Sequence, residues 1–255
     1  IPNSVEEIEN YAFCHCANLT SVTVFDSVVA QYAFDCCNPD LIIIAPTYSS
    51  AHDYTIENSI NFVSTGEVNP FKYELNYYGE SYRFSHCALA FKGEVVVLNE
   101  YNGKPVTEIG DFAFTNCRGV TSVTIPNSVT SIGWYAFTNC TGLTSVTIPD
   151  SVASIDSEAF EGCVGLTSIA IPDSVTYISS SAFSCCDNLK EILVSPNNCN
   201  YSSHDGVLFN KNKTTLVTYP HGKPEISYTI PNSVVEIDAE AFEFIQTLKR
   251  LTLPN

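Results

Sequence analysis

A repeat of about 23 residues constrains this chain more than any other feature. An Ala-Phe pair recurs with its Phe at positions 114, 137, 160 and 183, so that the successive intervals are identical. Repeats of this length add coils to one stack instead of forming separate cores, so a length of 255 residues does not predict two globular domains. The marker phenylalanines outline seven coils: Phe13, Phe34, Phe114, Phe137, Phe160, Phe183 and Phe242.

Apolar residues keep their places within each unit. The unit around Phe137 carries Val129, Ile132, Ala136, Cys140, Leu143, Val146 and Ile148. The same types return one repeat later as Val152, Ile155, Ala159, Cys163, Leu166, Ile169 and Ile171. One such unit cannot enclose a core, but stacking in register places like side chains on like side chains and buries continuous columns. The pattern therefore predicts a solenoid.

Each unit also contains a segment with the alternation of a half-buried strand. In residues 145–148 the apolar Val146 and Ile148 are expected to point inward, and Ser145 and Thr147 outward. Pro149 lacks a backbone donor and ends the ladder. We expect a partner to bind along the outward strip, which continues at its less polar end to Leu193. The predicted binding residues are Ser122, Thr124, Ser145, Thr147, Ser168, Ala170 and Glu191.

The complete pattern reads Ile-Pro-x-Ser-Val-x-x-Ile, then Ala-Phe-x-x-Cys-x-x-Leu-x-x-Val-x-Ile-Pro. It resembles the BspA-like leucine-rich repeats of bacterial and protist surface proteins, over residues 1–46, 107–196 and 226–255. The resemblance implies a β-rich leucine-rich-repeat solenoid, in which each repeat is one right-handed coil and a parallel sheet runs along one face. It also implies a surface adhesin or host-binding protein, located at the cell surface or outside the cell.

Two stretches depart from the repeat and divide the chain into three parts. Leucine-rich repeats are expected at 1–46 and 107–255, on either side of a divergent segment at 47–106 that carries no clean unit. A hairpin insertion is expected near 197–225: residues 205–219 read as two strands around a polar Asn-Lys turn, projecting from a coil. A second hairpin is expected over residues 93–106, with Val95, Val96 and Val97 before the turn at Asn102-Gly103, and the regular coils resume after it.

Six of the eleven cysteines lie three residues after a marker Phe. We interpret this column as small buried hydrophobes whose weak thiol donors cap the turn. The alternatives are a disulfide framework and a metal site. The run Cys14-His15-Cys16 resembles a metal chelate, but it has no second pair of ligands at the separation typical of zinc sites. His15 is expected to be a surface turn residue. One isolated disulfide among the other five cysteines stays open. The column is Cys16, Cys37, Cys117, Cys140, Cys163 and Cys186.

The net charge and the motifs of the sequence argue against several classes of function. A net charge of −17 with only 11 scattered Lys and Arg argues against nucleic acid. No apolar run approaches the roughly 20 residues of a membrane helix, so no membrane insertion is expected in this segment. No catalytic motif or cofactor loop is recognisable, so neither an enzyme nor a cofactor is predicted, although chemistry within residues 47–106 is a third hypothesis.

Two non-enzymatic functions remain. The first is a binding module for a protein or glycan, such as a host or extracellular-matrix component, that docks along the strand face. The second is a structural spacer or self-assembly unit within a larger surface protein. The chain opens and closes inside the repeat pattern, at Ile1 and at Leu253, so end-to-end self-association is a further expectation.

Overall fold

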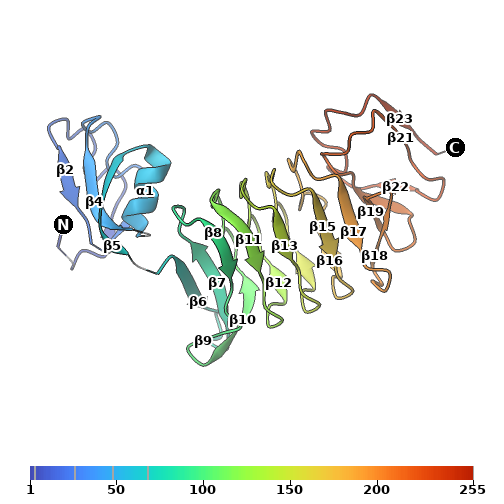
Figure 1. Cartoon of the computed structure of the whole chain (residues 1–255), viewed down its shortest axis with the longest axis horizontal. Helices are drawn as coiled ribbons and strands as arrows, with labels where there is room; N and C mark the ends of the chain where they lie inside the picture. The colour runs from blue at the N-terminus through green and yellow to red at the C-terminus, as the bar shows by residue number, and fades with distance from the viewer. Residues whose placement is uncertain (3, 26, 48, 68, 255) are drawn as a thin grey trace. The chain divides into compact units, whose positions relative to one another are not determined.

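The computed structural model describes every residue of the chain except 3, 26, 48, 68 and 255. The chain forms two compact units, residues 1–71 with 87–91 and residues 72–86 with 92–255. In both units short strands pair mostly in parallel with strands of neighbouring coils (Figure 1). The predicted β-rich solenoid is therefore confirmed.

The first unit has two small parallel sheets and one helix. β3 pairs with β1, and β4 lies between β2 and β5. Ser49 begins the helix, since its hydroxyl accepts the His52 N–H, and Ser59 ends it in a left-handed conformation. The elements are β1 (Glu7–Ile8), β2 (Ser21–Thr23), β3 (Val28–Val29), β4 (Ile42–Thr47), α1 (Ser50–Asn58) and β5 (Asn61–Glu67).

The second unit carries a long ladder along one side of its coils. Parallel pairing places Ile109, Ile132, Ile155 and Ile178 side by side, each one repeat after the last. At the start of the ladder, β9 and β10 form an antiparallel pair closed by Asn102-Gly103, both at positive φ, which is the expected turn. The valines expected in the same hairpin lie elsewhere, because residues 93–96 pair in parallel with residues 120–124. The strands are β6 (Phe71–Leu75), β7 (Tyr82–Cys87), β9 (Glu100–Tyr101), β10 (Lys104–Ile109), β12 (Ser131–Ile132), β14 (Ser154–Ile155) and β16 (Tyr177–Ile178).

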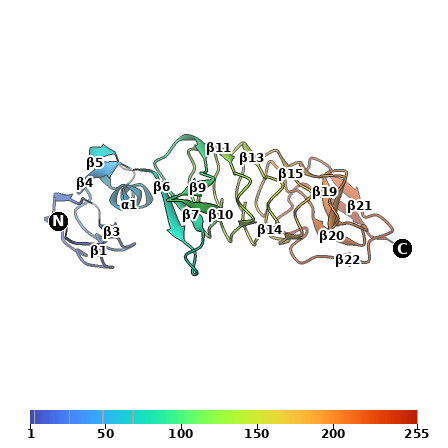
Figure 2. The same ribbon diagram turned by 90° about the horizontal axis from the view of Figure 1, so that it is seen from below.

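A second set of strands lines another side of the same coils. Figure 2 shows β11 and β13 along one side of the unit and β10 and β14 along the other. These strands contain the predicted Ser-Thr segments and form two parallel sheets, β8 with β11 and β13, and β15 with β17. The strands are β8 (Gly93–Val96), β11 (Val120–Thr124), β13 (Ser145–Thr147), β15 (Ser168–Ile171) and β17 (Glu191–Val194).

The last part of the unit contains the predicted hairpin. β19 and β20 pair antiparallel, as expected, but they do not project from the coil. Val207, Phe209 and Leu216 are fully buried in the core, because an apolar hairpin gains more from packing between coils than from standing in water. The strands are β18 (Tyr201–His204), β19 (Val207–Asn210), β20 (Thr215–Thr218), β21 (Ser227–Thr229), β22 (Glu236–Ile237) and β23 (Arg250–Thr252).

The marker phenylalanines form the centre of the core. In the second unit they stack face to face, with ring centroids 4.6 to 5.7 Å apart. Phe84, which sequence analysis did not mark, is the first member of this stack and lies 4.6 Å from Phe114. Part of the divergent segment is thus a coil of the solenoid. The stacked residues are Phe84, Phe114, Phe137, Phe160 and Phe183.

Candidate functional site

The predicted binding residues lie side by side on the strands of the second unit. Strand pairing places Ser122 next to Ser145 and Thr124 next to Thr147. On the other sheet it places Ser168 next to Glu191 and Ala170 next to Leu193. All of these residues are exposed except Ser122, which is half-buried. We call these eight residues the strand face.

The hydroxyl groups of the strand face differ from most others in the coils in their hydrogen bonding. Elsewhere in the coils, serine and threonine hydroxyls commonly donate to the carbonyl of an adjacent coil, as Thr144 does to Thr121 and Ser151 to Val129. In the part of the chain that the structure describes, the hydroxyls of Ser145, Thr147 and Ser168 make no hydrogen bond. They are therefore available to donate to and accept from a ligand.

Apolar side chains flank these hydroxyls. β8 adds Val96 beside Thr124, and its side chain is 65% exposed. At the other end Leu193 is 46% exposed. Val146, expected to point inward, is only half-buried. The strand face thus combines free hydroxyls, which can donate and accept hydrogen bonds, with exposed aliphatic groups, which can make apolar contacts.

The column cysteines tie each coil to the one before. The Cys140 Sγ donates to the Phe114 carbonyl at 2.9 Å, Cys163 to Phe137 at 3.1 Å, and Cys186 to Phe160 at 3.0 Å. Burial raises the pKa of Cys186 to about 12 and raises the pKa of Cys163 well above its usual value. These thiols are consequently structural rather than nucleophilic.

Two members of the column differ from the expected burial. Cys16 and Cys37 are only half-buried, because the coils of the first unit cover them less completely. Cys37 still donates to the Phe13 carbonyl, at 3.0 Å. All eleven cysteines are free thiols in the structure. Among the described residues, no group of three or more His, Cys, Asp or Glu side chains is placed to hold a metal ion.

Each regular coil turns sharply around its marker Phe, and we call the row of these turns the turn edge. The second residue after the Phe has a left-handed backbone, with φ of 62° at Asn116 and 57° at Asn139. Its N–H donates to a carbonyl of the next coil, as Asn116 does to Thr138 and Asn139 to Glu161. His15 occupies the same position with φ of 59° and is exposed, which confirms it as a surface turn residue.

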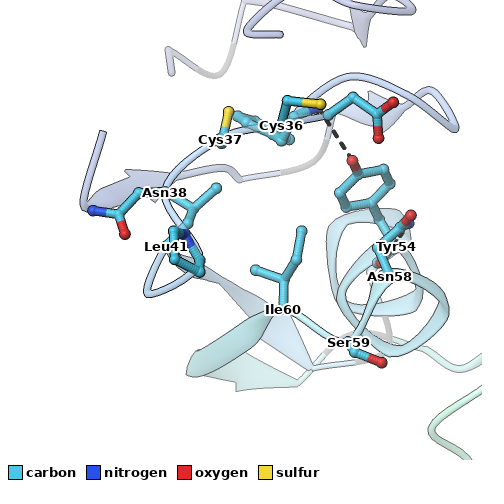
Figure 3. A pocket seen from close by; sticks show the side chains of 11 residues that line it. Cys36, Cys37, Asn38, Leu41, Tyr54, Asn58, Ser59 and Ile60 are labelled. Carbon is cyan, nitrogen blue, oxygen red and sulfur yellow. Dashed lines mark hydrogen bonds between the residues drawn. The ribbon is translucent and has the colours of Figure 1, made fainter. Parts of the chain in front are cut away.

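A cavity of about 300 Å³ in the first unit opens where this row is interrupted. The coil after Phe34 has helix α1 in place of a turn, and the Tyr54 hydroxyl accepts the Phe34 N–H at 3.1 Å (Figure 3). Cys36 and Cys37 line one side of the cavity and Ile60 lines another. Nothing in the repeat pattern indicates a helix here, so this cavity could not be expected from the sequence.

Comparison with known proteins identifies the repeat. A family model described as a BspA type leucine rich repeat region matches residues 1–91, 107–228 and 224–255. The match includes residues 47–91, which sequence analysis had placed in the divergent segment. A comparison with curated proteins found no match.

Several solved structures are similar to this chain. A leucine-rich repeat protein from Eubacterium ventriosum shares 28% identity with a TM-score of 0.54, over 73% of this chain and 58% of that one. The pneumococcal vaccine antigen PcpA shares 22% identity with a TM-score of 0.52, over 74% of this chain and 64% of that one. The chain therefore spans less than two thirds of the length of either protein. A leucine rich cell surface protein from Faecalibacterium prausnitzii matches at 20% identity and a TM-score of 0.46, over 73% and 76% of the two chains.

The helical structure of the described residues is too short to cross a bilayer. Helix α1 has nine residues, and none of the described helical structure is long and apolar enough for a membrane span.

Proposed function

Because this chain belongs to the BspA-type leucine-rich repeat family, we propose that it is a non-enzymatic module that binds a protein partner along the strand face. The supporting observation is the row of exposed hydroxyls that make no hydrogen bond within the described protein, next to the exposed Val96 and Leu193. The similarity in fold to the pneumococcal vaccine antigen PcpA supports a place of action at the cell surface or outside the cell.

The strand face has the dimensions of a peptide site. Neighbouring parallel strands lie roughly 4.8 Å apart, so three of them give a strip about 10 Å wide between the outer strands. A partner segment crossing β8, β11 and β13 meets Glu94, Ser122 and Ser145 in one row and Val96, Thr124 and Thr147 in the next. A structural spacer is the competing function, and it does not depend on the identity of these residues.

The test replaces Ser145 and Thr147 together with Arg and measures binding to a panel of extracellular-matrix proteins and glycans. A matched control places Arg at Asn127 and Thr141, which are exposed residues outside the strand face. Both variants should keep the melting temperature of the parent, since exposed substitutions change stability by about 0.5 kcal/mol or less. Only the strand-face variant should lose its protein partner.

Two results would overturn this assignment. If both variants bound the protein partner equally well, the strand face would have no role in binding. Loss of binding on Lys213→Glu, in the turn between β19 and β20, would move the site to the hairpin. If the parent bound only glycans, and the strand-face variant lost that binding, the proposed site would stand and the partner would be a glycan instead of a protein.

A further inference from the structure

The turn edge of the second unit has a gap between the coils of Phe183 and Phe242. Regular turns occupy 157–162, 180–185 and 239–244. The coil between the last two has Tyr219 in the position of the marker Phe, since Tyr219 stacks on Phe242 at 5.2 Å and its N–H donates to the Ala241 carbonyl. That coil lacks the regular turn around its aromatic residue, because β20 runs to Thr218 and Pro220 follows Tyr219. Its turn comes later, at 220–223, where the Lys223 N–H donates to the Pro220 carbonyl.

The missing turn leaves a cavity of about 260 Å³. The turns on either side of the gap form its walls. Its lining consists of Glu158, Glu161, Ser181, Ser184, Glu240, Glu243 and Phe244. Sequence analysis placed no function here, because these residues are far apart in the chain and the cavity arises from a segment that is absent from one coil.

Two hydrogen-bond donors at the gap lack the partner that other coils supply. The Thr115 and Thr138 hydroxyls donate to the carbonyls of Tyr135 and Glu158 in the next coil. Ser184 is the equivalent residue in the coil of Phe183. It is only 9% exposed, and its side chain lines the cavity. Its hydroxyl makes no hydrogen bond within the described chain.

The second donor is the N–H of Cys185. The equivalent N–H groups of Asn116, Asn139 and Gly162 each donate to a carbonyl of the following coil. The N–H of Cys185 has no such acceptor among the described residues, because the turn of the following coil lies later in the chain, at 220–223. Neither group has a protein acceptor among the described residues, so both can donate to oxygen atoms of a ligand.

The same cavity is strongly negative. In the described part of the chain none of its four glutamates forms an ion pair. Burial, and then the charge of Glu158, raise the pKa of Glu161. The nearby Cys185 thiol also has a raised pKa, first through burial and then through Glu161 and other carboxylates. A cationic group in the cavity would relieve this repulsion.

We propose that the gap docks a polypeptide segment of a protein partner that carries a Lys or Arg side chain. The cationic side chain lies among the four glutamates, and its aliphatic stem packs on Phe244, which is 61% exposed. Main-chain carbonyls of the segment accept the Ser184 hydroxyl and the Cys185 N–H in place of the missing turn. This site is on the turn edge and does not depend on the strand face.

The probe is the peptide acetyl-Gly-Arg-Gly-amide, titrated into the whole chain at low ionic strength and followed by NMR. The control peptide has citrulline in place of Arg, which keeps the shape and removes the charge. The test variant combines Glu161→Gln with Glu243→Gln, and the matched control combines Glu7→Gln with Glu9→Gln, which are exposed residues of the first unit. The two variants have the same net charge.

The parent and the control variant should bind the Arg peptide equally. The test variant should bind it about tenfold or more weakly, the range for losing hydrogen bonds to a charged group. Ser184→Ala should weaken binding several-fold without lowering the melting temperature, because this hydroxyl makes no hydrogen bond to any described residue of the free protein. Equal binding of the citrulline peptide, or undiminished binding by the test variant, would refute the proposal. Saturation by spermidine without any binding of the peptide would also overturn it, because the site would then recognise a free polyamine.

Discussion

The role of the cysteine column can be tested at Cys140, which is fully buried. Its Sγ donates to the Phe114 carbonyl at 2.9 Å, but that carbonyl also accepts the Cys117 N–H at 2.9 Å. Cys140→Ala therefore leaves no orphaned acceptor and removes only the packing and the weak bond of one sulfur atom. We expect it to lower the free energy of unfolding by roughly 1–2 kcal/mol.

Cys140→Asp should behave very differently from Cys140→Ala. A carboxylate at this position would enter the column without a cation to pair with, and burying it should cost about 4 kcal/mol or more at neutral pH. Burial raises the pKa of the introduced carboxyl in the folded state above its unfolded value. The stability penalty should consequently be complete above the folded pKa and should shrink as the pH falls toward the unfolded value of about 3.9.

Urea unfolding followed by circular dichroism, at pH 4 and pH 7, measures both variants. Cys140→Ser is the matched control, since it is similar in size and keeps a donor for the Phe114 carbonyl. A Cys140→Asp variant within about 1 kcal/mol of the parent at pH 7 would mean that water enters the column, and the account of a dry, stacked core would be wrong.

Three other measurements check the remaining features. A thiol reagent at neutral pH should label the exposed Cys36 and Cys199 well before the buried members of the column, which are Cys117, Cys140, Cys163 and Cys186, and mass spectrometry that finds equal rates would contradict the burial. Burial raises the pKa of Glu108 and of Asp156, so at these two groups the native state holds more protons than the unfolded chain. The denaturation midpoint should therefore fall as the pH rises above the ordinary carboxyl range, and a Glu108→Gln variant should show a flatter dependence of the midpoint on pH. Gly165→Ala should lower the free energy of unfolding by about 1–3 kcal/mol, because its Cβ would lie 2.4 Å from the Leu143 carbonyl oxygen. An unchanged denaturation midpoint would indicate that neighbouring coils can move apart without loss of stability.

The regular coils could be predicted from the sequence because every contact in them repeats at one interval. Phe137 and Cys140 recur unchanged one repeat later, as Phe160 and Cys163, so a single pattern determines the core, the strand face and the thiol column. The position of the outward residues followed from the alternation alone. What they bind could not follow from it, since exposed side chains are not constrained by the packing.

The interruptions could not be predicted in the same way. Phe84 belongs to the aromatic stack but is separated from Phe114 by more than one repeat length, so a search at the regular interval passes over it. Cys87 follows Phe84 by three residues, the same spacing as in the cysteine column, and could have marked this coil in the sequence. It is buried in the structure. Tyr219 replaces an Ala-Phe pair, and helix α1 is short and largely polar, so neither carries the marker. Both cavities occur at such interruptions, which explains why the repeat did not reveal them.

The repeated link from each column cysteine to the coil before it has a consequence for how the length of such a protein can change. Cys163 contacts Phe137 as Cys186 contacts Phe160, so each coil between them presents the same two surfaces to its neighbours. Removing or duplicating one complete repeat would join surfaces that already fit. The stack can therefore grow or shorten in whole coils within the regular run, whereas the coil of Tyr219 has no equivalent neighbour and sets a boundary to such changes.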